Sequence, residues 1–362
     1  MSSAEATHAA TGLLAVLRER IRQDGPLRLD AYMAACLADA EHGYWNKPCS
    51  IGAEGDFITA PEISQVFGEL LGLWAATIWQ GMGRPALVRL VELGPGRGTL
   101  MRDALRAAAV VAPFRAALSV HLIEKSPALR GLQQAVLAPG GPASPCWHEH
   151  LADVPAGPTI VLGNEFLDAL PIRQLVFCEE VWRERTVELD GEGALRFGLG
   201  AVVPFQGHAP ARAGDVAELR SGEDAILHEL KKRAPAISAL FIDYGPAEPA
   251  YGDTLQAVRR HAYVDPLSDP GDVDLTAHVH FAGLARRARA AGLAVHGPLT
   301  QADFLGRLGV VERAARLMAA NPAAANQIEA AVQRLLTPTG MGGQCKVLAV
   351  SSPQLPSPAP FA

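Results

Sequence analysis

A glycine-rich turn follows a predicted buried strand in the segment VRLVELGPGRGT, and its residue types suit cofactor binding. The glycines are Gly94, Gly96 and Gly98, and the acidic Glu92 ends the strand just before them. Glycine adopts backbone conformations that other residues avoid and lets a ligand approach the backbone closely. The dinucleotide-binding fingerprint requires its third glycine one position later, where this chain has Thr99. The spacing therefore favours S-adenosyl-L-methionine (SAM) over NAD as the cofactor that Glu92 and the three glycines would bind.

A second acid stands where the ribose of such a cofactor is expected. Glu124 ends the next predicted strand, residues 119–124, about 26 residues beyond Gly98. At this place in a nucleotide-binding α/β sheet, an acidic side chain accepts hydrogen bonds from ribose hydroxyls. We therefore expect Glu124 to bind the ribose, although an exposed glutamate at a strand end would give the same pattern.

A helix start before the first strand offers a place for an anion. Thr59 and Glu62 have the spacing of a capping box, and Pro61 suits the first helical turn. Free amides at such a start attract anions, so we expect the cofactor carboxylate beside Thr59. Asp56, in Gly-Asp-Phe, is a further candidate cofactor ligand, although an aspartate next to glycine is as often a turn former.

Further acids follow later predicted strands. Glu165 and Asp168 come directly after the strand at residues 159–163, and Asp243 ends the strand at residues 237–243. Ligands of open α/β sheets bind outside the carboxyl ends of the strands, so these acids face the appropriate edge. Glu165 and Asp168 are three residues apart and are predicted to form a carboxylate clamp for a guanidinium or ammonium group. The alternative is that Asp168 only caps a helix.

Other chemistries have little support in the sequence. His278 and His280 invite a metal interpretation, but no third ligand has suitable spacing, so we expect no metal site. No G-x-S-x-G segment is present, which disfavours hydrolase chemistry. The 32 basic and 38 acidic residues give a net charge of −6, and we expect no nucleic-acid partner.

The composition of the chain indicates where the protein is located and whether it enters a membrane. The five cysteines are scattered and odd in number, which is typical of a reducing compartment. No apolar run reaches the roughly 18 residues that a membrane span needs, so we expect no membrane insertion. The first 23 residues carry Glu5 and Glu19 and resemble neither a secretory signal nor a transit peptide. These features predict a cytoplasmic protein, and they leave its oligomeric state open.

Apolar runs and helical stretches alternate from residue 88 onward, which predicts a doubly wound, mostly parallel α/β sheet. Two helices, residues 13–22 and 29–40, begin a predicted N-terminal helical cap that covers residues 1–85. Residues 86–351 form the main predicted domain, with a β-hairpin insertion at about residues 174–233. Four prolines in residues 352–362 predict a disordered tail. The strands expected in the sheet are residues 88–93, 119–124, 146–148, 159–163, 237–243, 293–296 and 346–351.

Several long segments together resemble the MidA-like family of SAM-dependent methyltransferases. They are GYW (43–45), GDFITAPEISQ (55–65), FGELLG (67–72), VELGPGRGTL (91–100), NEFLDALP (164–171), WRE (182–184), DYG (243–245), DLT (274–276) and PTGMG (338–342). The resemblance extends from about residue 26 to residue 350. Asn164 departs from it, because the mitochondrial relatives are expected to carry histidine at this position.

The resemblance implies a class I methyltransferase fold with a seven-stranded sheet, SAM as cofactor and a protein arginine as substrate. The family includes a mitochondrial complex I assembly factor that methylates an arginine, so the implied partner is a protein, possibly a respiratory complex I subunit. Two other functions stay open: a non-catalytic SAM-binding assembly factor and a methyltransferase that acts on small molecules. An NAD-dependent oxidoreductase is disfavoured by Thr99.

Overall fold

The computed structural model describes residues 12–47, 58–137, 144–233 and 235–361. The contacts divide the chain into two units, each built from separate stretches of sequence. The first, which we call the antiparallel unit, contains Met1–Ser50, Pro171–Arg220 and Tyr251–Ala277. The second, which we call the parallel-sheet unit, contains Ile51–Leu170, Ser221–Ala250 and His278–Ala362.

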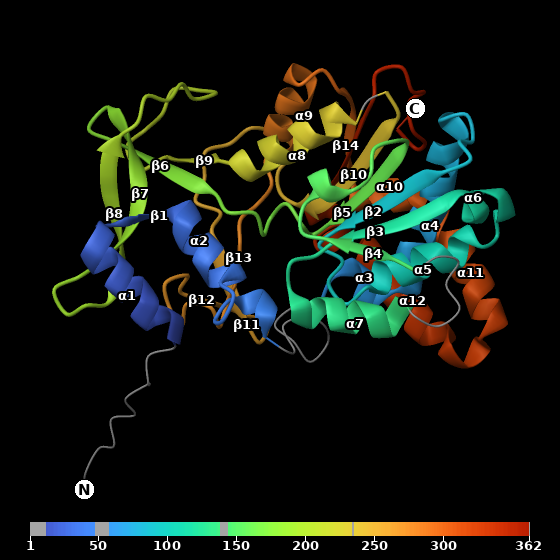
Figure 1. The fold of residues 1–362 in the computed structure, drawn as a ribbon, viewed down its shortest axis with the longest axis horizontal. Coiled ribbons are helices and arrows are strands. Elements are labelled where there is room, and N and C mark those ends of the chain that lie inside the picture. Colours follow the sequence, from blue (N-terminus) through green and yellow to red (C-terminus); the bar gives the residue numbers. More distant parts are fainter. Residues whose placement is uncertain (1–11, 48–57, 138–143, 234, 362) are drawn as a thin grey trace, which may run out of the picture. The chain divides into compact units, whose positions relative to one another are not determined.

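Seven strands of the described chain form the sheet of the parallel-sheet unit, in the order β14-β15-β10-β5-β2-β3-β4 (Figure 1). The strands from β10 to β4 pair in parallel, whereas β15 pairs antiparallel with both β10 and β14. The predicted fold class, a seven-stranded and mostly parallel α/β sheet, is confirmed. The strands are β2 (Val88–Leu93), β3 (Leu118–Ile123), β4 (Cys146–His148), β5 (Thr159–Asn164), β10 (Ile237–Tyr244), β14 (Ala294–Thr300) and β15 (Cys345–Ser351).

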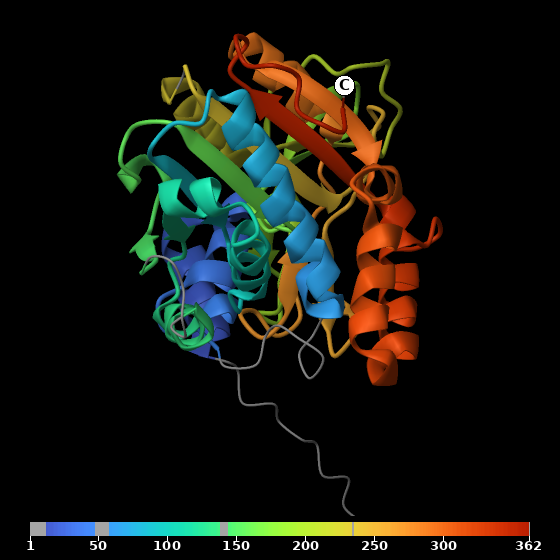
Figure 2. The ribbon, with the colours of Figure 1, turned by 90° about the vertical axis from the view of Figure 1, so that its right-hand side faces the viewer.

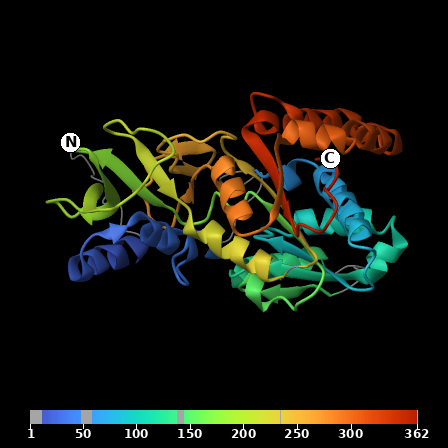
Figure 3. The ribbon, with the colours of Figure 1, turned by 90° about the horizontal axis from the view of Figure 1, so that it is seen from above.

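Helices cover both faces of this sheet, which explains why its strands are apolar along their length. Leu90 of β2 packs into one hydrophobic core and the next residue, Val91, packs into the other. The first core receives side chains from α4, α5, α10, α11 and α12, and the second from α8 and α9. Figure 2 shows α4 in light blue close to α11 and α12 in orange-red, and Figure 3 shows α8 in yellow beside α9 in orange. The helices are α3 (Ala60–Ile63), α4 (Gln65–Gly81), α5 (Thr99–Ala108), α6 (Ala112–Ala117), α7 (Pro127–Leu137), α8 (Ser221–Lys232), α9 (Phe281–Ala290), α10 (Gln301–Arg307), α11 (Val310–Ala320), α12 (Ala325–Leu336) and α13 (Met341–Gln344).

The helix predicted to begin at Thr59 is divided into two pieces. Ser64 adopts an extended conformation (φ −152°) that ends α3 after four residues, and its hydroxyl then accepts the N–H of Val66 to cap α4. Thr59 is the N-cap of α3, but its side chain makes no capping hydrogen bond. The predicted capping box does not form, because Glu62 accepts the hydroxyl of Thr99 instead.

The antiparallel unit contains the first two helices and the strands inserted into the sequence of the other unit. The predicted β-hairpin corresponds to β7 and β8, but these strands belong to a five-stranded sheet in the order β1-β7-β6-β9, with β8 beside β7. Trp182 of β7 packs with Leu175 and Ala217 in the core of this sheet. A three-stranded sheet, β12-β11-β13, completes the unit. Its elements are α1 (Gly12–Asp24), β1 (Leu27–Arg28), α2 (Leu29–Ala38), β6 (Arg173–Cys178), β7 (Val181–Leu189), β8 (Leu195–Val202), β9 (Val216–Leu219), β11 (Gln256–Arg259), β12 (Ala262–Val264) and β13 (Asp274–Thr276).

The structure divides the chain differently from the predicted segments 1–85, 86–351 and 352–362. Helix α4 packs on the parallel sheet rather than in a separate cap. The C-terminal residues up to 361 are packed as well: the indole N–H of Trp74 donates to the carbonyl of Ala359 (2.8 Å), and the ring of Phe361 lies 5.6 Å from that of Phe304. Prolines restrict the unfolded backbone, so a few contacts are enough to order this segment. No helix in the described part of the chain is both long and apolar enough to cross a membrane.

Candidate active site

The glycine turn lies at the carboxyl end of β2, as the sequence predicts. Gly94, Gly96 and Gly98 all have positive φ values, of 60°, 52° and 84°, which glycine adopts without steric cost. Gly94 also leaves no space for a side chain, because an added Cβ would lie 2.8 Å from the ring of Phe166. On the other side, a Cβ on Gly98 would lie 3.4 Å from the Cα of Gln133 in α7. The turn is therefore held between the loop after β5 and helix α7.

Glu92 lies in the sheet below this turn. The side chain is buried, and it accepts a hydrogen bond from the backbone N–H of Met101 in the first turn of α5. The N-cap of α5 is Gly98, which has no side chain to offer, so Glu92 satisfies one of the free amides of that helix. Its second oxygen, Oε2, has no hydrogen-bond partner among the described residues. Burial raises the pKa of Glu92 to about 8.

Glu124 lies at the end of β3, where the sequence predicts a ribose ligand. Its Oε1 accepts the backbone N–H of Ser126 (2.8 Å), and its Oε2 accepts the side-chain amide of Gln133 (3.2 Å). Burial raises the pKa of Glu124, and the two hydrogen bonds oppose that rise. Gln133 was not identified from the sequence. In the sequence, Gln133 is a single amide on the apolar side of a helix, and this position does not reveal which groups it contacts.

Three acids gather at the carboxyl ends of β5 and β10, as the sequence predicts for this edge. Asp243 is fully buried (0% exposed), and its Oδ2 accepts the backbone N–H groups of Phe166 (3.1 Å), Leu167 (2.8 Å) and Asp168 (3.3 Å). Asp243 therefore fixes the loop that carries Glu165 and Asp168. Burial raises the pKa of Asp243 well above its ordinary value, and the charges of Asp168 and Glu165 raise it further.

Glu165 is held in an unusual conformation. Its φ is +48°, which is uncommon for a residue with a side chain. Oε1 accepts the backbone N–H of Ala60 (3.0 Å) and the side-chain amide of Asn164 (3.1 Å). Burial raises the pKa of Glu165 to about 7, with a smaller contribution from the charge of Asp168. Backbone strain of this kind occurs preferentially at functional sites.

The anion position expected beside Thr59 is already partly used by the protein itself. The first free amide of α3, the N–H of Ala60, donates to the Glu165 carboxylate. The short helix thus joins the acid loop, a link that the sequence does not indicate. Asp56 lies outside the described residues.

Tyr244 and Cys345 border the acids, and neither was predicted as a site residue from the sequence. The hydroxyl of Tyr244 is hydrogen-bonded to the thiol of Cys345, and both groups lie close enough to Glu165 and Asp168 to sense their charges. Burial is the main cause that raises the pKa of each group. Both side chains are therefore neutral and provide a largely apolar wall beside the carboxylates.

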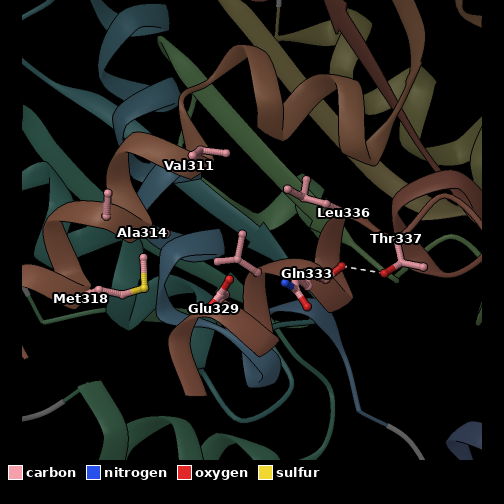
Figure 4. A pocket seen from close by; sticks show the side chains of 9 residues that line it. Val311, Ala314, Met318, Glu329, Gln333, Leu336 and Thr337 are labelled. Atoms are coloured by element: carbon pink, nitrogen blue, oxygen red, sulfur yellow. Dashed lines mark hydrogen bonds between the residues drawn. The ribbon is translucent and has the colours of Figure 1, made fainter. Parts of the chain in front are cut away.

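One hollow on this unit lies away from these residues. It has a volume of about 480 Å³ between α11 and α12, and Figure 4 shows its mostly apolar lining, with Met318 and the single carboxylate Glu329. A SAM site needs several polar groups for an amino acid and a ribose, so we do not place the cofactor there. Among the described residues, no three His, Cys, Asp or Glu side chains are grouped to hold a metal ion.

Known proteins similar to this chain include mitochondrial protein arginine methyltransferases. The NDUFAF7 homolog of Drosophila melanogaster is 35% identical over 388 residues, which cover 96% of this chain and 86% of the relative. NDUFAF7 of Homo sapiens is 34% identical over 370 residues, covering 93% of this chain and 82% of the relative. A crystal structure from Burkholderia thailandensis, of a superfamily member bound to S-adenosyl-homocysteine, has a TM-score of 0.80 and 29% identity and covers 94% of this chain and 91% of that chain.

These relatives correct one expectation. The sequence predicted a cytoplasmic protein, whereas the curated relatives are mitochondrial proteins, and the prediction is therefore wrong. It relied in part on scattered cysteines, of which Cys36, Cys146, Cys178 and Cys345 are free in the structure. Free thiols indicate only that the fold does not depend on disulfides, so they do not distinguish one reducing compartment from another.

The comparisons also agree on chemistry. A family model of S-adenosyl-L-methionine-dependent methyltransferases matches residues 70–299. That stretch contains the glycine turn, Glu124 and the acid loop after β5. The match covers more than half of the chain, and the relatives above extend it over almost the whole length. The chain therefore belongs to the family of SAM-dependent methyltransferases.

Proposed function

We propose that this chain transfers a methyl group from SAM to an arginine of a protein client. The observation that supports the proposal most is the group of acids Glu165, Asp168 and Asp243 at the carboxyl ends of β5 and β10, next to the glycine turn. A guanidinium group is cationic in water, because its pKa is above about 12, and it pairs well with carboxylates. The relatives named as protein arginine methyltransferases support the same substrate class.

In this proposal, the cofactor lies over Gly94, Gly96 and Gly98, and Glu124 binds its ribose. The backbone of Gly94 is exposed, and the left-handed turn presents it without a side chain. The Glu124 carboxylate accepts hydrogen bonds from Ser126, Gln133 and the backbone of Lys125, and a carboxylate has about four acceptor sites, so one stays available for a ribose hydroxyl. These features fit SAM.

The remaining cofactor residues have supporting roles in the proposal. Glu92 supports the turn from the sheet side, and its buried Oε2 has no partner among the described residues. Thr59 lies at the start of α3, beside the N–H that Glu165 accepts, and we assign it to the cofactor carboxylate. Asp56 is kept as a predicted ligand on its sequence position alone.

Glu165 and Asp168 form the proposed clamp for the arginine. Both hydrogen bonds to Glu165 go to Oε1, which leaves Oε2 for a guanidinium N–H. Asp243 does not belong to the clamp, because its oxygens already accept backbone amides, and it positions the other two acids. The clamp orients the nucleophilic nitrogen toward the turn, and most of the rate is expected from this positioning.

The chemistry requires an acceptor for one proton. SAM supplies a methyl group on a positively charged sulfur. Transfer forms a nitrogen–carbon bond, returns the sulfur–carbon pair to sulfur and releases one N–H proton from the guanidinium. Glu165 is suited to take this proton, because its pKa is raised to about 7 and a proton acceptor works best near the ambient pH.

The client is proposed to be a subunit of the respiratory complex I type. The identity of the client is inferred from the relatives, which are NDUFAF7 proteins. The test is incubation of the purified chain and methyl-labelled SAM with a mitochondrial lysate, followed by mapping of the labelled residue by mass spectrometry. The expected product is one labelled protein with methyl groups on arginine.

Variants test the assignment of residues. Glu165→Gln with Asp168→Asn is expected to lower turnover by about 100-fold or more, the range seen when preorganised electrostatic groups are removed. Gly96→Val should abolish S-adenosyl-homocysteine binding, because its φ of 52° disfavours a β-branched residue. The matched control is Glu312→Gln, an exposed carboxylate on α11. Full turnover in the double variant would refute the clamp. Label found only in low-mass products would instead identify a small-molecule methyltransferase, and binding without any turnover would identify a non-catalytic assembly factor.

A further inference from the structure

Gln133 connects the two proposed halves of the cofactor site. Its side chain is fully buried (0% exposed) on α7. The amide Nε2 donates to the carbonyl oxygen of Gly96 (2.8 Å) and to Oε2 of Glu124 (3.2 Å), and the amide Oε1 accepts the indole N–H of Trp147 (2.8 Å). Both amide hydrogens and the amide oxygen therefore have partners in the protein.

The orientation of this amide follows from Trp147. An indole N–H can only donate a hydrogen bond, so it must face the oxygen of Gln133. The NH₂ group is then forced toward Gly96 and Glu124, which both present acceptors. A flipped amide would place donors against the indole and an oxygen against a carboxylate. The network thus has one satisfied arrangement.

The consequence for Glu124 is a fixed carboxylate plane. Ser126 N–H holds one oxygen and Gln133 holds the other, so the side chain cannot rotate without losing a hydrogen bond in a buried site. Gln133 also favours the ionised form of Glu124, which accepts hydrogen bonds with both oxygens. The same amide fixes the carbonyl of Gly96 and therefore the turn.

Given the proposed assignment of Glu124 and the glycine turn to SAM, we propose that Gln133 is a positioning residue that sets cofactor affinity by orienting both groups. It does not touch the reacting atoms. Its replacement should therefore raise the dissociation constant of the cofactor and the KM for SAM, and it should change kcat much less.

The test is Gln133→Glu, which keeps the shape of the side chain and the acceptor for Trp147 but removes the NH₂ group. At pH 8 a carboxylate then faces the Glu124 carboxylate and the Gly96 carbonyl with no donor between them. Binding of S-adenosyl-homocysteine, measured by calorimetry, is expected to weaken by about 10- to 100-fold, as for loss of a hydrogen bond to a charged group. The matched control is Gln134→Glu, the same change at the next residue of α7, where the side chain is exposed. It should bind like the parent.

Acidic pH provides a second readout of the same hydrogen bond. Two adjacent carboxylates take up a shared proton at a raised pKa, and that proton supplies the missing donor. The affinity of Gln133→Glu relative to the parent should therefore recover between pH 8 and pH 5.5. A constant ratio over this range would overturn the proposal.

A second pair of variants separates this inference from the proposed function. Glu124→Gln should weaken binding, and adding Gln133→Glu to it should weaken binding by a smaller factor than Gln133→Glu does alone, because the new amide at 124 can donate to the new carboxylate at 133 and only the Gly96 carbonyl still loses its donor. If Glu124→Gln binds like the parent, the cofactor assignment itself fails. If Glu124→Gln binds weakly but Gln133→Glu binds like Gln134→Glu, only the role of Gln133 fails. Should Gln133→Glu not fold, Trp147→Phe removes the orienting N–H together with part of the ring and is expected to weaken binding several-fold. Unchanged affinity in that variant would overturn the proposal.

Discussion

Asp243 offers a quantitative test of how the acid loop is held. Four backbone N–H groups donate to its carboxylate: Phe166, Leu167 and Asp168 to Oδ2, and Tyr244 to Oδ1 (2.9 Å). A buried N–H that loses its acceptor costs about 1–3 kcal/mol. In Asp243→Asn, the remaining oxygen can serve the three loop amides while the NH₂ group faces Tyr244, so one amide is left unpaired. In Asp243→Ala, all four amides lose their acceptor.

The difference between the two variants is the informative quantity. Both variants remove the same buried carboxyl group, whose raised pKa makes the absolute cost of removing its charge depend on pH. That contribution cancels when alanine is compared with asparagine. Three further unpaired amides then predict that the alanine variant is less stable than the asparagine variant by about 3 kcal/mol or more.

The assay is urea unfolding at pH 7, supported by hydrogen exchange of the amides at residues 166–168. The exchange measurement reports on the loop alone, which matters because a chain with two units need not unfold in one step. The control is Ser238→Ala on the same strand, whose buried hydroxyl has no partner among the described residues and whose loss should cost little. Equal stability of the alanine and asparagine variants, with loop amides exchanging as in the parent, would refute the role assigned to Asp243.

Three further predictions follow from the same unit. The pKa of Glu92 is raised to about 8 from 4.5, so its burial lowers the stability of the fold progressively as the pH rises between those values. Glu92→Gln should therefore melt at a higher temperature than the parent at pH 9 but not at pH 5. The same difference in melting temperature at both pH values would contradict this. Glu69 is buried between Arg106 (2.9 Å) and Arg313 (2.8 Å) and connects α4, α5 and α11. Glu69→Ala should therefore lower the free energy of unfolding by about 2–4 kcal/mol, and a loss below 1 kcal/mol would show that the partly exposed arginines simply rehydrate. Gly94→Ala should weaken S-adenosyl-homocysteine binding more than Gly83→Ala. Both glycines have positive φ, but only a Cβ on Gly94 would meet a neighbouring side chain. Equal binding by the two variants would rule out a steric role for Gly94.

Much of the fold and the place of the acids could be predicted because they depend on local sequence. Apolar runs of β-branched residues predicted the parallel strands within a few residues, since both faces of such a sheet are buried. Glu165, Asp168 and Asp243 were expected at one edge because each follows a strand, and parallel strands end on the same side. These inferences need only the order of elements along the chain.

The contacts that complete the site depend on distant residues and could not be predicted. Glu62 had capping-box spacing to Thr59, yet Thr99 is its partner across 37 residues of sequence. The N–H of Ala60 is taken by Glu165, 105 residues away. A local pattern shows that a donor or an acceptor is present, but packing decides which partner it meets. The antiparallel unit was missed for the same reason, because its strands come from three separate stretches and one is only two residues long.

Strand order explains why the turn is the sensitive point of this architecture. β2 lies between β5 and β3, so the loop after β5 and the helix after β3 meet the glycine turn from opposite sides. Phe166 contacts the turn at Gly94 from the side of the acids, and Gln133 holds it at Gly96 from the side of Glu124. The proposed clamp and the proposed ribose ligand are thus aligned through one short segment of backbone. A displacement of the turn by one residue of strand register would move the methyl donor relative to the clamp and to the ribose ligand. We therefore expect substitutions in the turn to impair cofactor binding and methyl transfer together. Substitutions of Glu165 and Asp168 should impair methyl transfer alone.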